Sequence, residues 1–308
     1  MDPVSQPILV LMDYRGGDRF RRCLASLAPA EHYFSRIIIS VTADQNSEDM
    51  EIAQQYRVEN PDSKVEILCT GVEMPTLQHQ AFWVDYLENS GTMPSDWIYW
   101  LAYDDQIRPA GIERISRTDG SWKLRPGTAY FGPWAMRHEQ ADELYPGPWD
   151  EPLESWTSFP VPEPTRMTVI SWIARQLKQP TYMQMSGSIC SFESFLQLRD
   201  GRPRKTGPMR IEMAIAAATC NTHVEEFPEP ISIIYGRPNS DRASYGAAAR
   251  KEDKHLLAWL ARYGVAHPLS IPSLIGHSIS TAVHLLGLGK KSASTIEEDW
   301  VVRGTVQP

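Results

Sequence analysis

Residues 97–107 read WIYWLAYDDQI, an aromatic and aliphatic run that stops on two adjacent carboxylates, Asp104 and Asp105. A strand buried on both faces of a parallel sheet has such a near-continuous apolar sequence, and ligands of open α/β sheets bind at the carboxyl ends of the strands. Mg²⁺ and Mn²⁺ bind one or two carboxylates and take their other ligands from water and phosphate. The pair therefore predicts a metal or phosphate site, with a solvated turn as the alternative.

The residues before this run alternate between short apolar segments and segments with helical spacing. The apolar segments predict strands at 8–12, 37–41 and 65–69. Helical spacing predicts a helix after each of them, and the second helix is expected to start at a capping pair, Asn46 with Asp49, and to end at Pro61. Strands and helices in this order imply right-handed crossovers and a mostly parallel sheet. The expected fold class is therefore α/β.

The order and residues of these motifs resemble the GT-A glycosyltransferases of the family 2 type, over residues 8–107. LMDYRGGDRFRRCLASL, residues 11–27, is similar to that family's first strand and helix, and it places Asp13, Tyr14 and Arg15 at the family's substrate-binding motif. The resemblance implies a Rossmann-like sheet that is flanked by helices and binds a nucleotide-sugar donor.

Two further motifs carry the donor side of the resemblance. SVTADQNSED, residues 40–49, is a partial match to the segment whose acidic residue holds the nucleotide base, and Asp44 is its best match. LAYDD, residues 101–105, resembles the family's metal signature LDADD, with Ala102 in place of the first aspartate. The resemblance implies Asp104 and Asp105 as ligands of a divalent metal, Mn²⁺ or Mg²⁺, with Asp104 also close to the donor.

The second half resembles the acceptor side of the same family. MSGSI, residues 185–189, is similar to the strand that forms the floor of the acceptor pocket, which implies that Ser186, Gly187 and Ser188 bind substrate. A glycine there lets a sugar approach the backbone closely, and an ordinary glycine turn is the alternative.

RIEMAIAAAT, residues 210–219, resembles the family's acidic motif at a helix start, with Glu212 in the place of the catalytic aspartate. An inverting transfer needs a carboxylate within hydrogen-bond reach of the acceptor hydroxyl, so Glu212 is the candidate general base. A glutamate in a first helical turn is also favoured by the helix dipole alone. Glu193 is the reserve candidate.

The segment 234–245 reads IYGRPNSDRASY and lacks the histidine that the family often carries here. Arg237 and Arg242 are candidates to bind the leaving diphosphate, because guanidinium groups bind phosphate through two hydrogen bonds. Asp241 is the candidate replacement for the missing metal ligand. A solvated loop rich in Gly, Pro, Asn and Ser is the alternative.

Composition favours an enzyme that does not bind nucleic acid. The 308 residues carry a net charge of −8, whereas binding to phosphate backbones requires a basic surface. The sequence has no run of about 20 apolar residues and no signal-peptide pattern at its start, so we expect a cytoplasmic protein. The four cysteines are far apart and form no CxxC pair, which predicts free thiols.

We expect a nucleotide-sugar-binding half at 1–110, an acceptor-binding half at 111–250, and a helical extension at 251–308. The aromatic and acidic segment 134–165 is expected to be a long loop, either an acceptor lid or a loop anchored by its own aromatic residues. The apolar stretch 271–288 either packs on the catalytic domain or contacts the inner face of a membrane peripherally.

The function expected from the resemblance is inverting transfer of a hexose from a nucleotide-diphosphate donor to a saccharide or lipid-linked saccharide acceptor, in bacterial-type surface polysaccharide synthesis. Two alternatives remain. A sugar-phosphate nucleotidyltransferase would use a glycine-rich phosphate loop, of which RGGDR, residues 15–19, is a poor version. A degenerate, non-catalytic sugar-binding module is favoured by Ala102 and by the missing histidine.

Overall fold

The computed structural model describes residues 6–117, 119–131, 135–138, 157–158, 166–169, 171–172, 186–200, 221–227 and 230–236. Its main sheet has eight strands in the order β3-β2-β1-β4-β10-β6-β11-β9. The strands span β1 Ile8–Asp13, β2 Arg36–Val41, β3 Val65–Cys69, β4 Trp97–Ala102, β6 Thr128–Phe131, β9 Arg166–Thr168, β10 Ser188–Ser191 and β11 His223–Glu226.

The direction of the strands divides this sheet into two parts. The first four strands are parallel, as the alternation of strands and helices predicts. β10 then runs antiparallel to β4 and β6, and β11 is parallel to β6 and antiparallel to β9. The predicted class, an α/β fold of GT-A type with a mostly parallel sheet, is confirmed by this order.

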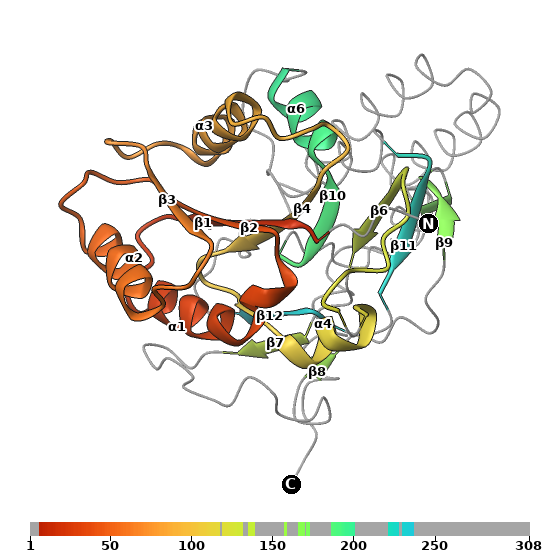
Figure 1. Ribbon diagram of the computed structural model, residues 1–308, viewed down its shortest axis with the longest axis horizontal. Helices are drawn as coiled ribbons and strands as arrows, with labels where there is room; N and C mark the ends of the chain where they lie inside the picture. The colour runs from red at the N-terminus through yellow and green to blue at the C-terminus, as the bar shows by residue number, and fades with distance from the viewer. Residues whose placement is uncertain are drawn as a thin grey trace, which may run out of the picture.

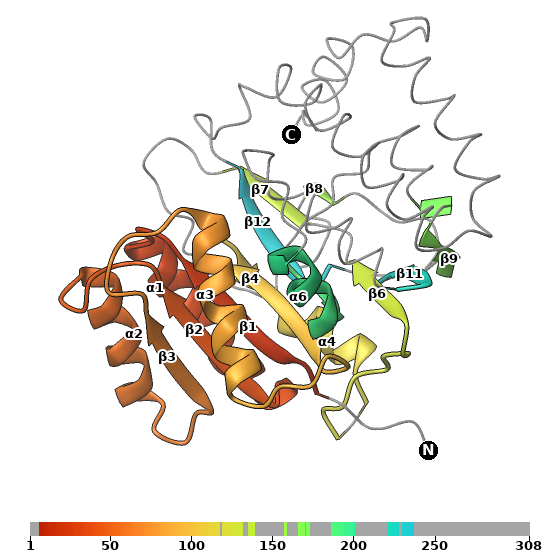
Figure 2. The ribbon, with the colours of Figure 1, turned by 90° about the horizontal axis from the view of Figure 1, so that it is seen from above.

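Helices cover both faces of the sheet (Figure 1). They span α1 Asp18–Leu27, the 3-10 helix η1 Ala28–Tyr33, α2 Glu48–Glu59, α3 Thr76–Asn89, α4 Pro109–Ile115 and α6 Phe192–Asp200. In Figure 1, α3 and α6 lie above the sheet, and α1 and α2 lie below it. Figure 2 shows α3 and α6 side by side over the same face.

β4 shows why the sequence forms a sheet between two layers of helices. Ile98 and Trp100 join the core under α3 and α6, whereas Tyr99 and Leu101 join the core on the face of α1. Successive side chains of a strand point to opposite faces, so only a continuous apolar run can fill both cores. Burial of each such side chain contributes about 1.5–3 kcal/mol relative to exposure.

The start of α2 differs from the prediction. Ser47 caps the helix, because its side chain accepts a hydrogen bond from the Met50 N–H at 3.3 Å. Asp49 instead points inward and accepts the N–H groups of Gly16 and Gly17 at 3.1 and 2.8 Å. The predicted pair of Asn46 and Asp49 is therefore wrong, because Asp49 binds the loop after β1.

A second sheet has the order β5-β12-β7-β8, with strands β5 Gln106–Ile107, β12 Ser232–Gly236, β7 Ala135–His138 and β8 Thr157–Ser158. β7 and β8 fall in the segment 134–165, so the expectation of a loop without strands is wrong there. β7 pairs with β12, a strand far away in the sequence, and this backbone pairing overrides a local composition rich in Pro and Trp. β5 directly follows Asp105, so this sheet is joined to the acidic motif.

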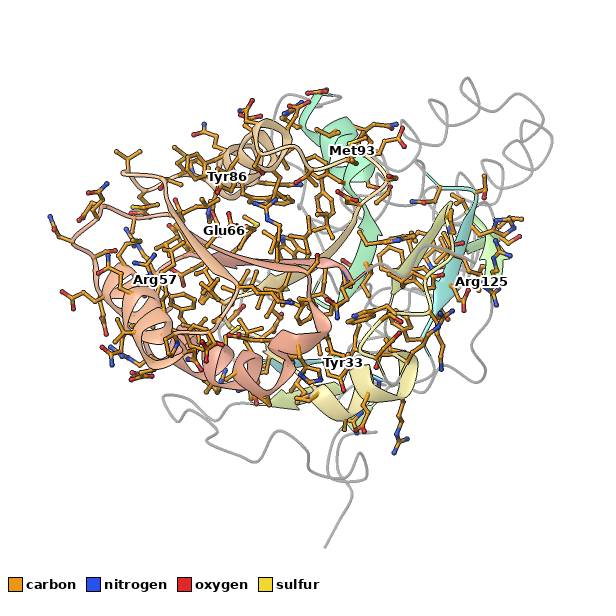
Figure 3. The ribbon with its side chains drawn as sticks, in the orientation of Figure 1. Tyr33, Arg57, Glu66, Tyr86, Met93 and Arg125 are labelled. Atoms are coloured by element: carbon orange, nitrogen blue, oxygen red, sulfur yellow. The ribbon has the colours of Figure 1, made fainter. Side chains whose placement is uncertain are left out.

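Polar contacts fix α3 to the sheet at the amino ends of β2 and β3. The Tyr86 hydroxyl donates to Glu66 at 2.7 Å, and Arg36 pairs with the same carboxylate at 2.9 Å. Figure 3 shows Glu66 and Tyr86 between the sheet and α3. These groups lie at the opposite edge of the sheet from the acidic motif, so they support the fold and not the site.

The state of the cysteines and the length of the helices also follow from the described residues. Cys23, Cys69 and Cys190 are free thiols, as predicted, and Cys220 lies outside the described residues. None of the described helices is both long enough and apolar enough to cross a bilayer. The predicted extension at 251–308 also lies outside the described residues.

Candidate functional site

The motifs of residues 8–107 meet at the carboxyl ends of β1, β2 and β4. Beyond the strands, the Thr42 N–H donates to the Asp13 carbonyl at 3.3 Å, and the Tyr103 N–H donates to the Met12 carbonyl at 3.1 Å. The segments that follow the three strands therefore stay side by side. This edge is where open α/β sheets bind ligands.

Asp105 is a buried carboxylate at this edge, with 6% of its surface exposed. Its N–H donates to the Ala102 carbonyl at 3.1 Å, which closes the turn after β4. The Ser186 hydroxyl donates to the Asp105 carboxylate and accepts the Ala102 N–H at 3.0 Å. The structure thus brings together two motifs that the sequence places in different halves.

The segment predicted as the acceptor floor begins with a turn. β10 starts at Ser188, which pairs with Trp100, and Gly187 precedes it with a positive φ of 83°. A Cβ at Gly187 would lie 2.5 Å from the Ser232 Oγ, so the close approach of β12 requires a glycine here. Ser186 and Ser188 are both buried.

Asp104 lies beside a buried arginine, Arg22, which no sequence motif indicated. Arg22 of α1 donates to the Asp104 carbonyl at 3.3 Å, and its guanidinium lies 3.6 Å from the centre of the Tyr235 ring. The Tyr235 hydroxyl in turn donates to Gln106. Arg22, Tyr235 and Gln106 form a network that contacts the acidic turn from the side of α1. Its one sequence signal is a charged residue within the buried face of α1.

The turn after β1 is shaped by a second pair of acids. Asp13 is 1% exposed, and its burial, together with the nearby charge of Asp49, raises its pKa to about 9, so it is neutral at pH 7. A Cβ at Gly16 would lie 2.3 Å from the Asp13 Oδ1, so the turn requires a glycine there. Asp13 therefore packs behind the turn that carries Tyr14 and Arg15.

Tyr14 and Arg15 present their side chains at the surface of this edge. Both donate to Glu73, which follows β3, at 2.5 and 2.6 Å. These hydrogen bonds, from Tyr14 first and then Arg15, hold the pKa of Glu73 below its usual value. The Tyr14 ring is 43% exposed and can stack against a ligand. Glu73 was not identified from the sequence, because no motif includes it.

Asp44 lies at the same edge, after β2, with an exposed side chain. Its carboxylate accepts the Asn46 N–H at 2.7 Å and so shapes its own turn. Its side chain is accessible from the solvent.

Glu193, the reserve base, lies at the other end of β4. It starts α6, and its N–H donates to the Pro94 carbonyl at 2.9 Å, just before β4 begins. A strand rises about 3.3 Å per residue, so β4 alone separates the two ends by roughly 17 Å. The structure does not bring Glu193 to the acidic turn. Glu212, Arg237, Asp241 and Arg242 lie outside the described residues.

The described residues do not complete a metal site. Among them, no group of three or more His, Cys, Asp or Glu side chains could hold an ion. Asp104 and Asp105 still fit a hard divalent cation, because Mg²⁺ in phosphate-transferring sites binds one or two carboxylates together with substrate phosphate and water. Other ligands would come from the substrate or from residues outside the described set.

Comparison with solved structures finds distant likenesses. TarS 1-349 of S. aureus has 9% identity and a TM-score of 0.48, and the alignment covers 83% of this chain and 65% of TarS 1-349. The mannosyltransferase PcManGT of Pyrobaculum calidifontis, in complex with GDP-Man and Mn²⁺, has 10% identity and a TM-score of 0.48, with coverage of 96% and 79%. Both are GT-A glycosyltransferases, the group that the sequence motifs resemble.

A 4-diphosphocytidyl-2C-methyl-D-erythritol synthase also matches, with 7% identity, a TM-score of 0.39 and coverage of 78% of this chain and 96% of the synthase. No protein-family model matches the sequence, and no curated protein is similar to it. With TM-scores below 0.5, these alignments carry no conclusion about activity. The fold class follows from the sheet order, and the function is proposed from the site.

Proposed function

We propose that the protein is a glycosyltransferase that moves a sugar from a nucleotide-diphosphate donor to a saccharide or lipid-linked saccharide acceptor. The observation that carries this proposal is the arrangement around Asp105. A buried carboxylate at the carboxyl end of a central parallel strand is held by a hydroxyl from the other half of the chain. Asp104, Tyr14 and Asp44 lie on the same edge of the sheet.

The donor is proposed to lie across the carboxyl ends of β1, β2 and β4. The exposed Tyr14 ring and the Asp44 carboxylate would contact the base and ribose. Arg15 pairs with Glu73 at 2.6 Å, and its side chain is largely exposed, so the donor would be able to contact it at the surface of the site. The diphosphate would then lie toward Asp104 and Asp105.

A divalent cation, Mn²⁺ or Mg²⁺, fits the hard oxygen ligands of Asp104 and Asp105, with Asp241 as the proposed third ligand. When bound, such an ion neutralises negative charge on a leaving diphosphate. Asp105 contributes a carboxylate that Ser186 holds in one orientation. Arg237 and Arg242 are proposed to bind the diphosphate directly through their guanidinium groups.

Glu212 is the proposed general base. It would accept the proton of the acceptor hydroxyl as that oxygen attacks the anomeric carbon, which inverts the configuration there. Because the leaving diphosphate develops most of the charge, groups that stabilise this charge are expected to supply the larger share of the rate. We further propose a role in surface polysaccharide synthesis, with action in the cytoplasm and acceptors presented at the inner face of the membrane.

The structure bears on the nucleotidyltransferase alternative through the turn at RGGDR. Such an enzyme would bind phosphate with the backbone N–H groups of this loop. The N–H groups of Gly16 and Gly17 already donate to the Asp49 carboxylate. A carboxylate in this position repels phosphate, so the glycosyltransferase is favoured. A degenerate sugar-binding module has the same fold and differs only in the absence of turnover.

Calorimetry separates these three functions. A panel of nucleoside diphosphates and nucleotide sugars is titrated with and without Mn²⁺, and sugar transfer or donor hydrolysis is measured in parallel. We expect binding of at least one nucleoside diphosphate that strengthens with Mn²⁺, together with slow release of the sugar. Nucleotide binding without any turnover would indicate the degenerate module. Preference for a nucleoside triphosphate, with release of pyrophosphate, would indicate the nucleotidyltransferase.

A further inference from the structure

Ser186 lies where the two halves of the main sheet meet at the acidic turn. Its hydroxyl donates to the Asp105 carboxylate and accepts the Ala102 N–H at 3.0 Å. The residue is 2% exposed. A serine hydroxyl has one proton to donate, and here Asp105 receives it. Ser186 therefore has no proton left to offer a sugar.

The backbone of Ser186 is fixed from the opposite side by β12. The Ser232 hydroxyl donates to the Ser186 carbonyl at 2.7 Å. The neighbouring Gly187 N–H donates to the Trp100 carbonyl at 2.9 Å. Ser186 is thus held between β4 and β12, and its hydroxyl has a defined position relative to Asp105.

We propose that Ser186 is a positioning residue that holds Asp105 for the donor diphosphate and its divalent cation, and that it is not part of an acceptor floor. This inference rests on the proposed glycosyltransferase function. A hydrogen bond from a buried hydroxyl fixes the orientation of the carboxylate that receives it. Loss of such a partner of a metal-binding group typically weakens metal affinity or activity by about 10- to 100-fold.

The two possible roles of Ser186 predict that its loss weakens the interaction with different substrates. A residue that acts through Asp105 affects Mn²⁺-dependent donor binding, whereas a residue of the acceptor floor affects the KM for the acceptor. For Ser186→Ala we expect Mn²⁺-dependent binding of UDP or GDP, whichever the wild type binds, to weaken by about tenfold or more, with an unchanged acceptor KM. Ser186→Thr keeps the hydroxyl and should restore most of the binding.

Ser194→Ala is the matched control. Ser194 is equally buried, with 2% of its surface exposed, lies on the adjacent α6, and pairs with the Ser191 hydroxyl at 3.2 Å. The same substitution there should leave donor binding unchanged. If Ser186→Ala does not fold, Ser232→Ala tests the same support from outside, and it should weaken Mn²⁺-dependent binding by a smaller factor. Wild-type binding by Ser232→Ala in that case would overturn the inference.

A double-mutant cycle tests whether Ser186 acts through Asp105. If it does, Asp105→Asn combined with Ser186→Ala binds the nucleotide no more weakly than Asp105→Asn alone. Additive losses, or a raised acceptor KM with unchanged donor binding, would overturn the positioning role and leave the proposed function standing. A wild-type protein without any Mn²⁺-dependent nucleotide binding would instead overturn the proposed function itself.

Discussion

The buried acids at the carboxyl end of β4 differ in their partners from the acids near its amino end. Near the amino end, the Arg199 guanidinium lies 2.7 Å from Asp85 and 2.5 Å from Glu88, and Arg36 pairs with Glu66. At the carboxyl end, the buried Asp49 accepts backbone N–H groups and the buried Asp105 accepts a hydroxyl, whereas Glu73 at the surface pairs with Arg15 at 2.6 Å. The first group of acids is neutralised by arginines of its own chain.

This difference bears on where a ligand would bind. An acid paired with an arginine stabilises the packing of helices and has little charge left for a cation. The backbone N–H groups on Asp49 and the Ser186 hydroxyl on Asp105 hold these carboxylates in place without adding a counter-charge. This arrangement agrees with the proposed site for a cation and a diphosphate at the carboxyl end of β4, whereas the ion pairs near the amino end support the fold.

The largest effect is expected from Asp105→Ala. This change removes the buried carboxylate, so sugar transfer should fall by at least about a hundredfold, and Mn²⁺ should no longer strengthen donor binding. Transfer rates and calorimetry with and without EDTA measure both effects. Circular dichroism provides the control for folding. Unchanged turnover, or loss of the folded protein alone, would contradict a role at the site.

Glu212→Gln and Glu193→Gln compare the proposed base with an acid at the amino end of β4. The amide keeps the size of the side chain but cannot accept the acceptor proton, so kcat should fall by about 10²-fold or more while donor affinity stays near wild type. Glu193→Gln is the control and should have a mild effect, because Glu193 starts α6 beside Pro94. An inactive Glu193→Gln beside an active Glu212→Gln would reverse the assignment.

Asp13→Asn tests the buried acid behind the first turn. Burial raises the pKa of Asp13 to about 9, so the folded state keeps a proton that the unfolded state loses above its ordinary pKa of 3.8. The stability that this proton supports is complete below pH 3.8 and is lost as the pH rises toward 9.

The asparagine cannot ionise, so the variant should be more stable than the wild type by about 1 kcal/mol or more at pH 8, with a flatter dependence on pH. Urea unfolding between pH 6 and pH 9 measures this difference. Parallel stability curves for the two proteins would show that Asp13 ionises normally in the folded state.

The smallest effect is expected at the amino end. Arg199→Ala removes an arginine whose partners are half exposed, and exposed ion pairs contribute about 0–1 kcal/mol. We expect a small loss of unfolding free energy that decreases further in high salt, and unchanged transfer activity. A loss of activity of more than twofold would mean that the packing of α3 against α6 affects the structure of the site.

The sequence predicted the strands of the donor half closely. β3 spans Val65–Cys69, as the apolar run indicates, and β1 and β2 differ by single residues at their ends. β1 and β2 are buried on both faces, so their hydrophobic pattern alone determines them, whereas β3 is a half-buried strand at the edge of the sheet. The placement of Asp104 and Asp105 after β4 follows from the same pattern.

The contact between Ser186 and Asp105 could not be predicted. It depends on β10 entering the sheet antiparallel beside β4, and no local pattern encodes which strands become neighbours. Arg22 was missed for a related reason, since its role depends on Tyr235 of the second sheet. Asp49 had a local interpretation as a helix cap, and a tertiary contact with Gly16 and Gly17 replaced it.

The course of β12 has a consequence for protein engineering by segment exchange. β12 carries Ser232 and Tyr235, which reach the acidic turn through Ser186 and Arg22, and it ends at Gly236 just before Arg237. A graft taken from another enzyme should therefore begin after Gly236. An exchange that started earlier would replace Ser232 or Tyr235 and so disturb the acidic turn together with the exchanged segment.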